Sequence, residues 1–85
     1  MKTLEQIIEK EKQVRNEQGM FGINACKESI MSEINRHKNW NLESGTDKWN
    51  TSLYVMLENY VKRANTEVFF NSAMVLACWE LINER

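Results

Sequence analysis

The sequence predicts an all-α fold: a small compact bundle of about four helices joined by short loops, in a single domain spanning residues 1–85. Three observations lead to this prediction. The chain contains no proline, the residue that interrupts helices most strongly. Its three glycines, at positions 19, 22 and 45, fall between periodic segments. Apolar residues recur at helical spacing in four segments, and 85 residues suffice for one domain but not two.

The first helix is predicted from about residue 3 to residue 18. Thr3 and Gln6 have the spacing of a capping box, in which each side chain bonds the backbone N–H of the other residue. Gly19 is placed to end the helix. The apolar stripe is thin and consists of Leu4, Ile7, Ile8 and Val14. Because most other positions are charged, we expect this helix to pack mainly through its first two turns.

The second and third helices are predicted at about residues 24–39 and 46–64, with a loop over residues 39–45. Thr46 and Asp47 are both suitable N-caps for the third. The apolar stripe of the second helix contains Cys26, Ile30, Ile34 and His37. The third has the clearest helical spacing in the chain, formed by Trp49, Leu53, Met56, Leu57, Tyr60, Val61 and Ala64.

The fourth helix is predicted from Thr66, as its N-cap, to Asn83. It is the most apolar segment, because only three residues between positions 68 and 82 are polar. At about 100° per residue, its apolar residues fall on two nearly opposite faces. One face carries Phe70, Ala73, Met74, Ala77 and Leu81, and the other carries Val68, Val75, Trp79 and Ile82. A helix that is apolar on two faces is buried from both sides, so we expect it at the centre of the bundle.

The face formed by Val68, Val75, Trp79 and Ile82 allows two interpretations. Either the other three helices cover it within one chain, or it binds a protein partner. We favour the partner, because the first helix offers only four apolar residues as cover and large apolar patches usually mark interfaces. The sequence therefore predicts a non-enzymatic interaction or regulatory protein, with a homodimer as the expected assembly.

A small nucleic-acid-binding regulator is the alternative. The segment that would serve it combines cations with aromatic rings, an arrangement that can hold a phosphate backbone and stack a base. Its residues are Arg36, His37, Lys38, Trp40 and Lys48. The competing interpretation is that these charges stabilise the C-terminal end of a helix. The chain has eleven basic and twelve acidic residues, whereas nucleic-acid binders usually carry a basic excess, so we rank this function second.

Catalysis, metal binding and cofactor binding have little support in the residues. His37 is the one histidine, and its distance from Cys26 along a helix is about 16 Å, too far to share a proton. Cys26 and Cys78 have no Cys-x-x-Cys spacing, and glycine-rich nucleotide-binding motifs are absent. We therefore predict no enzyme activity, no metal, no cofactor and no small-molecule substrate. Both cysteines are predicted to be small apolar core residues.

We expect a cytoplasmic protein. The first residues lack the apolar run of a signal peptide, and the longest apolar stretch, residues 73–79, is much shorter than the roughly 20 residues that cross a membrane. The short length, ten asparagines and lack of catalytic motifs are typical of accessory proteins of phages or mobile elements. An inhibitor of host defence is one example of such a protein.

Overall fold

The structure, a computed structural model, describes residues 1–19, 21–36 and 47–84, and this part of the chain contains four α-helices and no strand. The helices are α1 (Leu4–Gln18), α2 (Phe21–Arg36), α3 (Asp47–Thr66) and α4 (Ala73–Asn83). The predicted all-α bundle is confirmed. Residues 37–39, included in the predicted second helix, lie outside the described residues. None of the described helices is long and apolar enough to cross a membrane.

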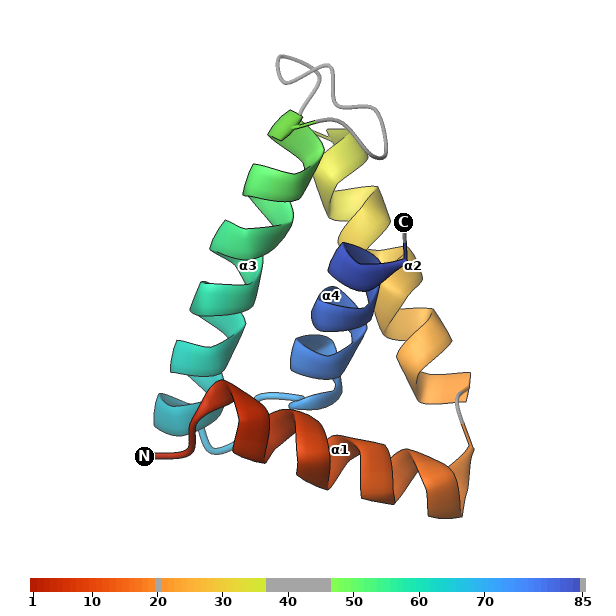
Figure 1. The fold of residues 1–85 in the computed structure, drawn as a ribbon, viewed down its shortest axis with the longest axis vertical. Helices are drawn as coiled ribbons and strands as arrows, with labels where there is room; N and C mark the ends of the chain where they lie inside the picture. The colour runs from red at the N-terminus through yellow and green to blue at the C-terminus, as the bar shows by residue number, and fades with distance from the viewer. Residues whose placement is uncertain (20, 37–46, 85) are drawn as a thin grey trace.

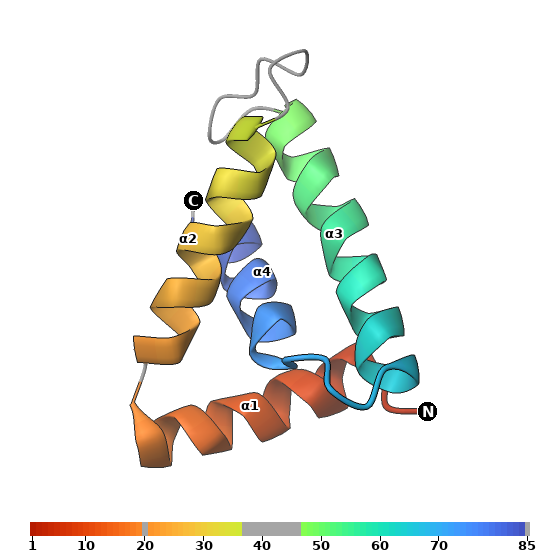
Figure 2. The same cartoon turned by 180° about the vertical axis from the view of Figure 1, so that it is seen from behind.

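The helix α4 is the element that the other three share. In Figure 1, α2 and α3 are inclined to each other, α1 runs across their lower ends and α4 lies in front of them; Figure 2 shows the same arrangement from behind, with α4 at the back. Each of α1, α2 and α3 packs mainly against α4. The predicted central position of the last helix is therefore correct.

The start of α1 is fixed by its cap. The backbone N–H of Gln6 donates to Thr3 Oγ1 at 3.3 Å, and the N–H of Thr3 donates to Gln6 Oε1 at 3.0 Å, so both halves of the predicted capping box form. At the other end, Gly19 has a φ of 85°, a conformation that glycine adopts without steric cost. Ile7 and Ile8 are buried, which places the packing of α1 in its first two turns as predicted.

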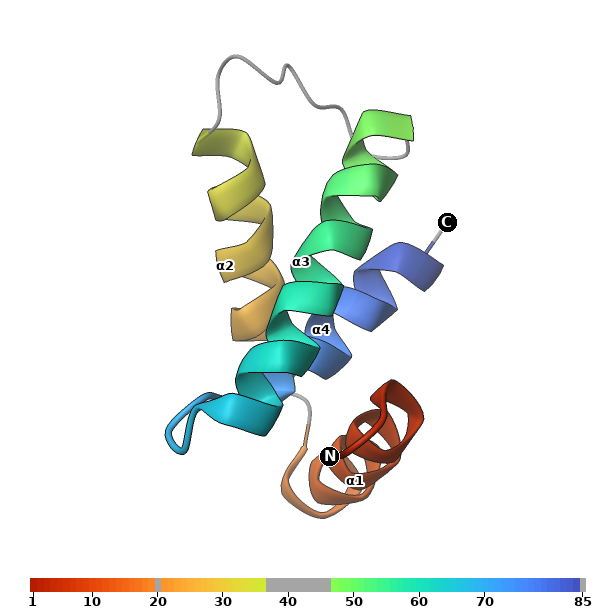
Figure 3. The same cartoon turned by 90° about the vertical axis from the view of Figure 1, so that its left-hand side faces the viewer.

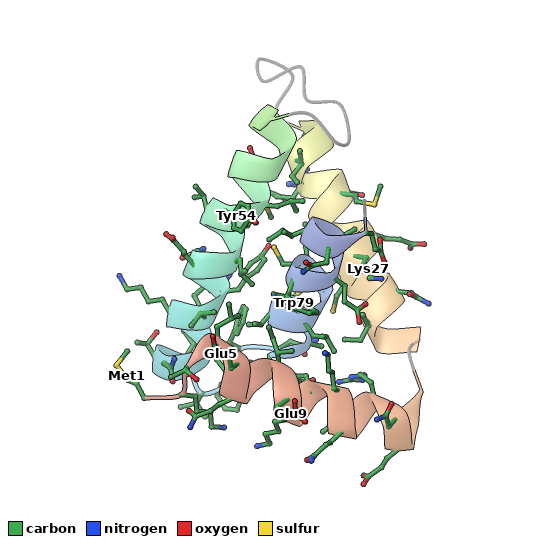
Figure 4. All side chains as sticks on the ribbon, in the orientation of Figure 1. Met1, Glu5, Glu9, Lys27, Tyr54 and Trp79 are labelled. Carbon is green, nitrogen blue, oxygen red and sulfur yellow. The ribbon has the colours of Figure 1, made fainter. Side chains whose placement is uncertain are left out.

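The core lies around α4. Six of the eleven α4 residues are buried: Ala73, Val75, Leu76, Ala77, Cys78 and Ile82. Around them the other helices contribute Ile7, Ile8, Ile23, Cys26, Ile30, Ile34, Leu53, Leu57 and Tyr60. At the far end of α4, Lys27 of α2 forms ion pairs with Glu80, at 2.9 Å, and with Glu84. Figure 4 shows Lys27 beside that end of α4.

The boundary between α3 and α4 differs from the prediction. Thr66 is the last residue of α3 and not the cap of the next helix. Its hydroxyl donates to the carbonyl oxygen of Lys62, one turn earlier, at 2.9 Å. The N–H of Glu67 continues the helical pattern by donating to the carbonyl of Arg63 at 2.7 Å. Thr66 therefore lies within α3, whose helical backbone bonding continues to the N–H of Glu67.

The helix α4 begins six residues later than predicted, with its N-cap at position 72 instead of 66. Its N-cap is Ser72, whose side chain makes no capping bond; instead Asn71 Oδ1 accepts the N–H of Ala73 at 3.0 Å. Asparagine side chains often accept a backbone N–H in this way at the start of a helix. Residues 67–72 consequently form a connection between two helices, and α4 has 11 residues.

Both cysteines are buried and free, which confirms their predicted place in the core. The Cys78 thiol donates to the carbonyl oxygen of Leu53 at 3.2 Å. Burial raises the pKa of this thiol from 9.0 to about 12. Burial also raises the pKa of Tyr60. Burial raises the pKa of Cys26 as well, and the positive charge of Arg15 partly opposes this effect.

These raised pKa values predict that the protein loses stability in alkali. Between pH 9 and pH 12 the folded chain keeps the Cys78 proton, whereas the unfolded chain releases it, so rising pH favours unfolding. The stabilising contribution is complete below about pH 9 and is lost progressively toward pH 12. Urea denaturation measured across this range should show a falling free energy of unfolding. A flat profile would contradict the burial of an un-ionised Cys78.

Candidate protein-interaction face

The four residues predicted to form an association face do not lie together on the surface. Val75 and Ile82 are buried inside the single chain, with exposed fractions of 0% and 7%. The expectation that three helices leave them uncovered is wrong. Since α4 has 11 residues rather than the 17 predicted after the Thr66 cap, its neighbours have less apolar surface to cover. Neither residue contacts a partner while the chain keeps this fold.

Trp79 is half-buried and packs against the core. The ammonium of Lys12, on α1, lies over its ring at 4.8 Å from the ring centroid. Such a cation–π contact also covers the ring with the long lysine side chain. Trp79 is labelled on α4 in Figure 4, above α1. Its position therefore reflects the packing of α1 on α4 more than an open apolar surface.

Val68 is the one predicted interface residue that is fully accessible. It is 91% exposed, and its neighbour Phe69 is 98% exposed. Both lie in the connection of residues 67–72, which we call the apolar loop. In Figure 3 this segment projects from the lower end of α3 on the same side of the molecule as α2. Two adjacent large apolar side chains thus stand almost entirely in solvent.

The apolar loop is anchored by Phe70, which points the opposite way. The ring of Phe70 stacks on Tyr60 with centroids 5.7 Å apart, and the guanidinium of Arg63 lies 4.7 Å from its centroid. On the α4 side, the Asn71 side chain holds the first N–H of the helix. Because the loop is fixed at both ends, Val68 and Phe69 are held outward by their neighbours.

A groove of about 540 Å³ lies next to the apolar loop, between α2 and α3. It is lined by Ser29, Glu33, Ile34, Ser52, Val55, Met56, Asn59, Tyr60, Arg63 and Met74. Its apolar part consists of buried Ile34 and Tyr60, half-buried Met56 and Met74, and Val55, which is 61% exposed. We call the groove and the apolar loop together the interaction face.

The groove and the loop are continuous. Arg63 and Met74 line the groove and also line the shallow depression around Val68 and Phe69. A ligand that occupies the groove therefore reaches the loop past two shared residues, the apolar Met74 and the ion-paired Arg63. One surface combines a recess with an apolar projection.

The charges at this face form pairs of opposite sign. Arg63 Nε donates to Glu67 Oε1 at 3.1 Å, and Arg36 Nη1 donates to Glu33 Oε2 at 3.2 Å. The other polar residues of the groove, Ser29, Ser52 and Asn59, are uncharged. Arg36 does not line the groove; counted with its partner Glu33 and with the Arg63–Glu67 pair, these described charges sum to zero, so the face offers no strong attraction to a highly charged ligand.

The residues of the nucleic-acid alternative are only partly described. Arg36 ends α2 and forms the ion pair with Glu33. His37, Lys38 and Trp40 lie outside the described residues, as does the side chain of Lys48 within α3. Nucleic-acid binding by this segment stays a prediction. Over residues 1–19, 21–36 and 47–84, no three His, Cys, Asp or Glu side chains group in a way that could hold a metal ion.

Sequence reasoning missed Phe69, Val55, Met56 and Met74 as surface-forming residues. The missed signal is the pair Asn71-Ser72, which reads as a helix start two residues before Ala73. If the helix begins at this pair, residues 67–70 belong to the connection between the helices. In the structure, two of the three apolar side chains of this connection are exposed. Comparisons with protein-family models, curated proteins and solved structures found no match for this chain.

Proposed function

We propose that this chain is a non-enzymatic protein-interaction protein that binds its partner through the interaction face. The observation that carries the proposal is the near-complete exposure of Val68 and Phe69 beside an apolar groove. Each Å² of apolar surface removed from water contributes about 25 cal/mol, and adjacent exposed apolar side chains are typical of binding surfaces. The face thus replaces the buried side of α4 as the proposed site of association.

The composition of the groove supports a protein ligand. Protein interfaces combine an apolar centre with a polar rim, and this groove has apolar residues flanked by Ser29, Ser52 and Asn59. Met56 and Met74 have flexible side chains that adjust to the shape of an inserted apolar group. An aromatic residue such as Phe69 is a common anchor of binding energy. A regulatory role, a cytoplasmic location and an origin in a phage or mobile element remain proposals from composition.

Site-specific photo-crosslinking in the source cell tests this function. A photo-reactive phenylalanine analogue in place of Phe69 should form covalent adducts with a protein, because the ring at this position contacts the partner. The same analogue in place of Tyr54 is the matched control. Tyr54 is an aromatic residue of α3, 53% exposed, and lines neither the groove nor the depression around the loop. Mass spectrometry then identifies each adduct.

We expect protein adducts through position 69 and only background through position 54. Either a second copy of the chain or a different protein in the adduct supports the function. Equal, background-level yields at the two positions would show that the exposed loop contacts no protein and would contradict the proposal.

A further inference from the structure

We propose that the occupant of the groove is the apolar loop of a second copy, in a two-fold symmetric dimer. This inference rests on the proposed function and names its partner. In a two-fold dimer each copy uses the same surface, so a projection on that surface must meet a recess on the same surface. The interaction face has both, joined through Arg63 and Met74.

The chemistry of the projection matches that of the recess. Val68 and Phe69 present only hydrocarbon, and Ile34, Met56 and Met74 give the groove a hydrocarbon lining. Insertion of Phe69 from each copy into the groove of the other removes both exposed side chains from water at once. It also covers Val55, which stands exposed at the groove.

The conformation of the apolar loop is already fixed in the single chain. Phe70 is held by stacking on Tyr60, and the N–H of Glu67 is bonded to the carbonyl of Arg63. A binding element whose conformation is already fixed loses little conformational entropy when it binds. An apolar loop held outward in this way therefore associates more tightly than a free segment of the same composition.

The charges favour a second copy over a strongly basic or acidic partner. Among the described residues, the face itself carries Glu33, Arg63 and Glu67, and its small negative excess is balanced by Arg36, which does not line the groove but pairs with Glu33. Two identical faces therefore approach without the repulsion that like-charged surfaces experience. A face selected for a highly charged partner would carry an excess of the opposite sign.

Sedimentation equilibrium of the purified chain over a wide micromolar range tests the dimer. Wild-type protein should show twice the chain mass of 10.1 kDa at the higher concentrations. Phe69→Glu should raise the dimer dissociation constant by roughly 1,000-fold. The loss of one Phe69 contact costs about 30-fold in affinity, and a two-fold symmetric dimer contains this contact twice. Tyr54→Glu, the same change outside the face, should leave the dimer intact.

Mixing two variants distinguishes reciprocal insertion of the loop into the groove from nonspecific association of apolar surfaces. Phe69→Glu damages the loop and Val55→Glu damages the groove, and each variant alone should be a monomer. In a mixed pair, the intact loop of the Val55→Glu copy still meets the intact groove of the Phe69→Glu copy. The mixture should therefore regain about half of the lost binding free energy, corresponding to a roughly 30-fold recovery. Both residues are exposed, and circular dichroism checks that both variants stay folded.

A monomeric wild type, a dimer unchanged by Phe69→Glu, or a mixture that stays monomeric overturns the inference. Crosslinking at position 69 tests the proposed function independently of these dimer measurements. If the chain is monomeric but position 69 crosslinks to a different protein, the function stands and the second copy is excluded. If position 69 crosslinks to nothing, both proposals fail.

Discussion

Leu76→Ala is expected to lower the free energy of unfolding by about 2–5 kcal/mol, the usual cost of removing a buried leucine side chain. Leu76 is fully buried and belongs to α4, the helix against which α1, α2 and α3 all pack. A chain of 85 residues has a total stability of roughly 4–13 kcal/mol, so this one substitution removes a large part of it. Urea denaturation followed by circular dichroism measures the change.

The control for this substitution is Val68→Ala. It also shortens an aliphatic side chain, but Val68 is 91% exposed and a surface change of this kind alters stability by less than about 0.5 kcal/mol. Similar losses for the two variants would mean that α4 is not the centre of the core. A large loss for Val68→Ala alone would contradict the exposed position of the apolar loop.

The second large effect concerns the reactivity of Cys78. At pH 8 a thiol of pKa 9.0 is about 10% ionised, whereas a thiol of pKa about 12 is about 0.01% ionised. Because the thiolate is the reactive form, but a thiolate of higher pKa is also the stronger nucleophile, the raised pKa of Cys78 should slow its reaction with a disulfide reagent by roughly 30- to 60-fold. Its complete burial slows the reaction further. In denaturant the difference disappears.

Cys26 provides the internal comparison. It is also buried, but 8% of it remains exposed, against 0% for Cys78, and the nearby Arg15 partly opposes the effect of burial on its pKa. In native protein we therefore expect the label on Cys26 before Cys78, as measured by peptide mapping after timed quenching. Equal labelling rates in the folded protein would contradict the packing of Cys78 against Leu53.

The sequence was sufficient for features that depend on local patterns. The capping box of Thr3 and Gln6, the helix stop at Gly19 and the burial of both cysteines follow from residue type and spacing, and all are confirmed. The central place of the last helix follows from its high apolar content. These features need no knowledge of which helix lies beside which.

The candidate site was harder to predict because it depends on one helix boundary. Thr66 is acceptable both as the last residue of α3 and as an N-cap; in the structure it ends α3, and its hydroxyl donates to the carbonyl of Lys62 instead of capping the next helix. Because Thr66 belongs to α3, Val68 lies in the connection between α3 and α4 and not on a helix face. The groove depends on the separation of α2 and α3, which periodicity within each helix does not encode.

The sharing of α4 by the other helices has a consequence for how the chain folds. Because α1, α2 and α3 contact one another much less than they contact α4, they have no adequate apolar surface to pack on while α4 is missing. A chain shortened to residues 1–72 is therefore expected to lack the stable tertiary packing of α1, α2 and α3. Contacts between α1 and α4 link distant parts of the chain, so the native packing of α1 depends on residues almost at the other end of the sequence.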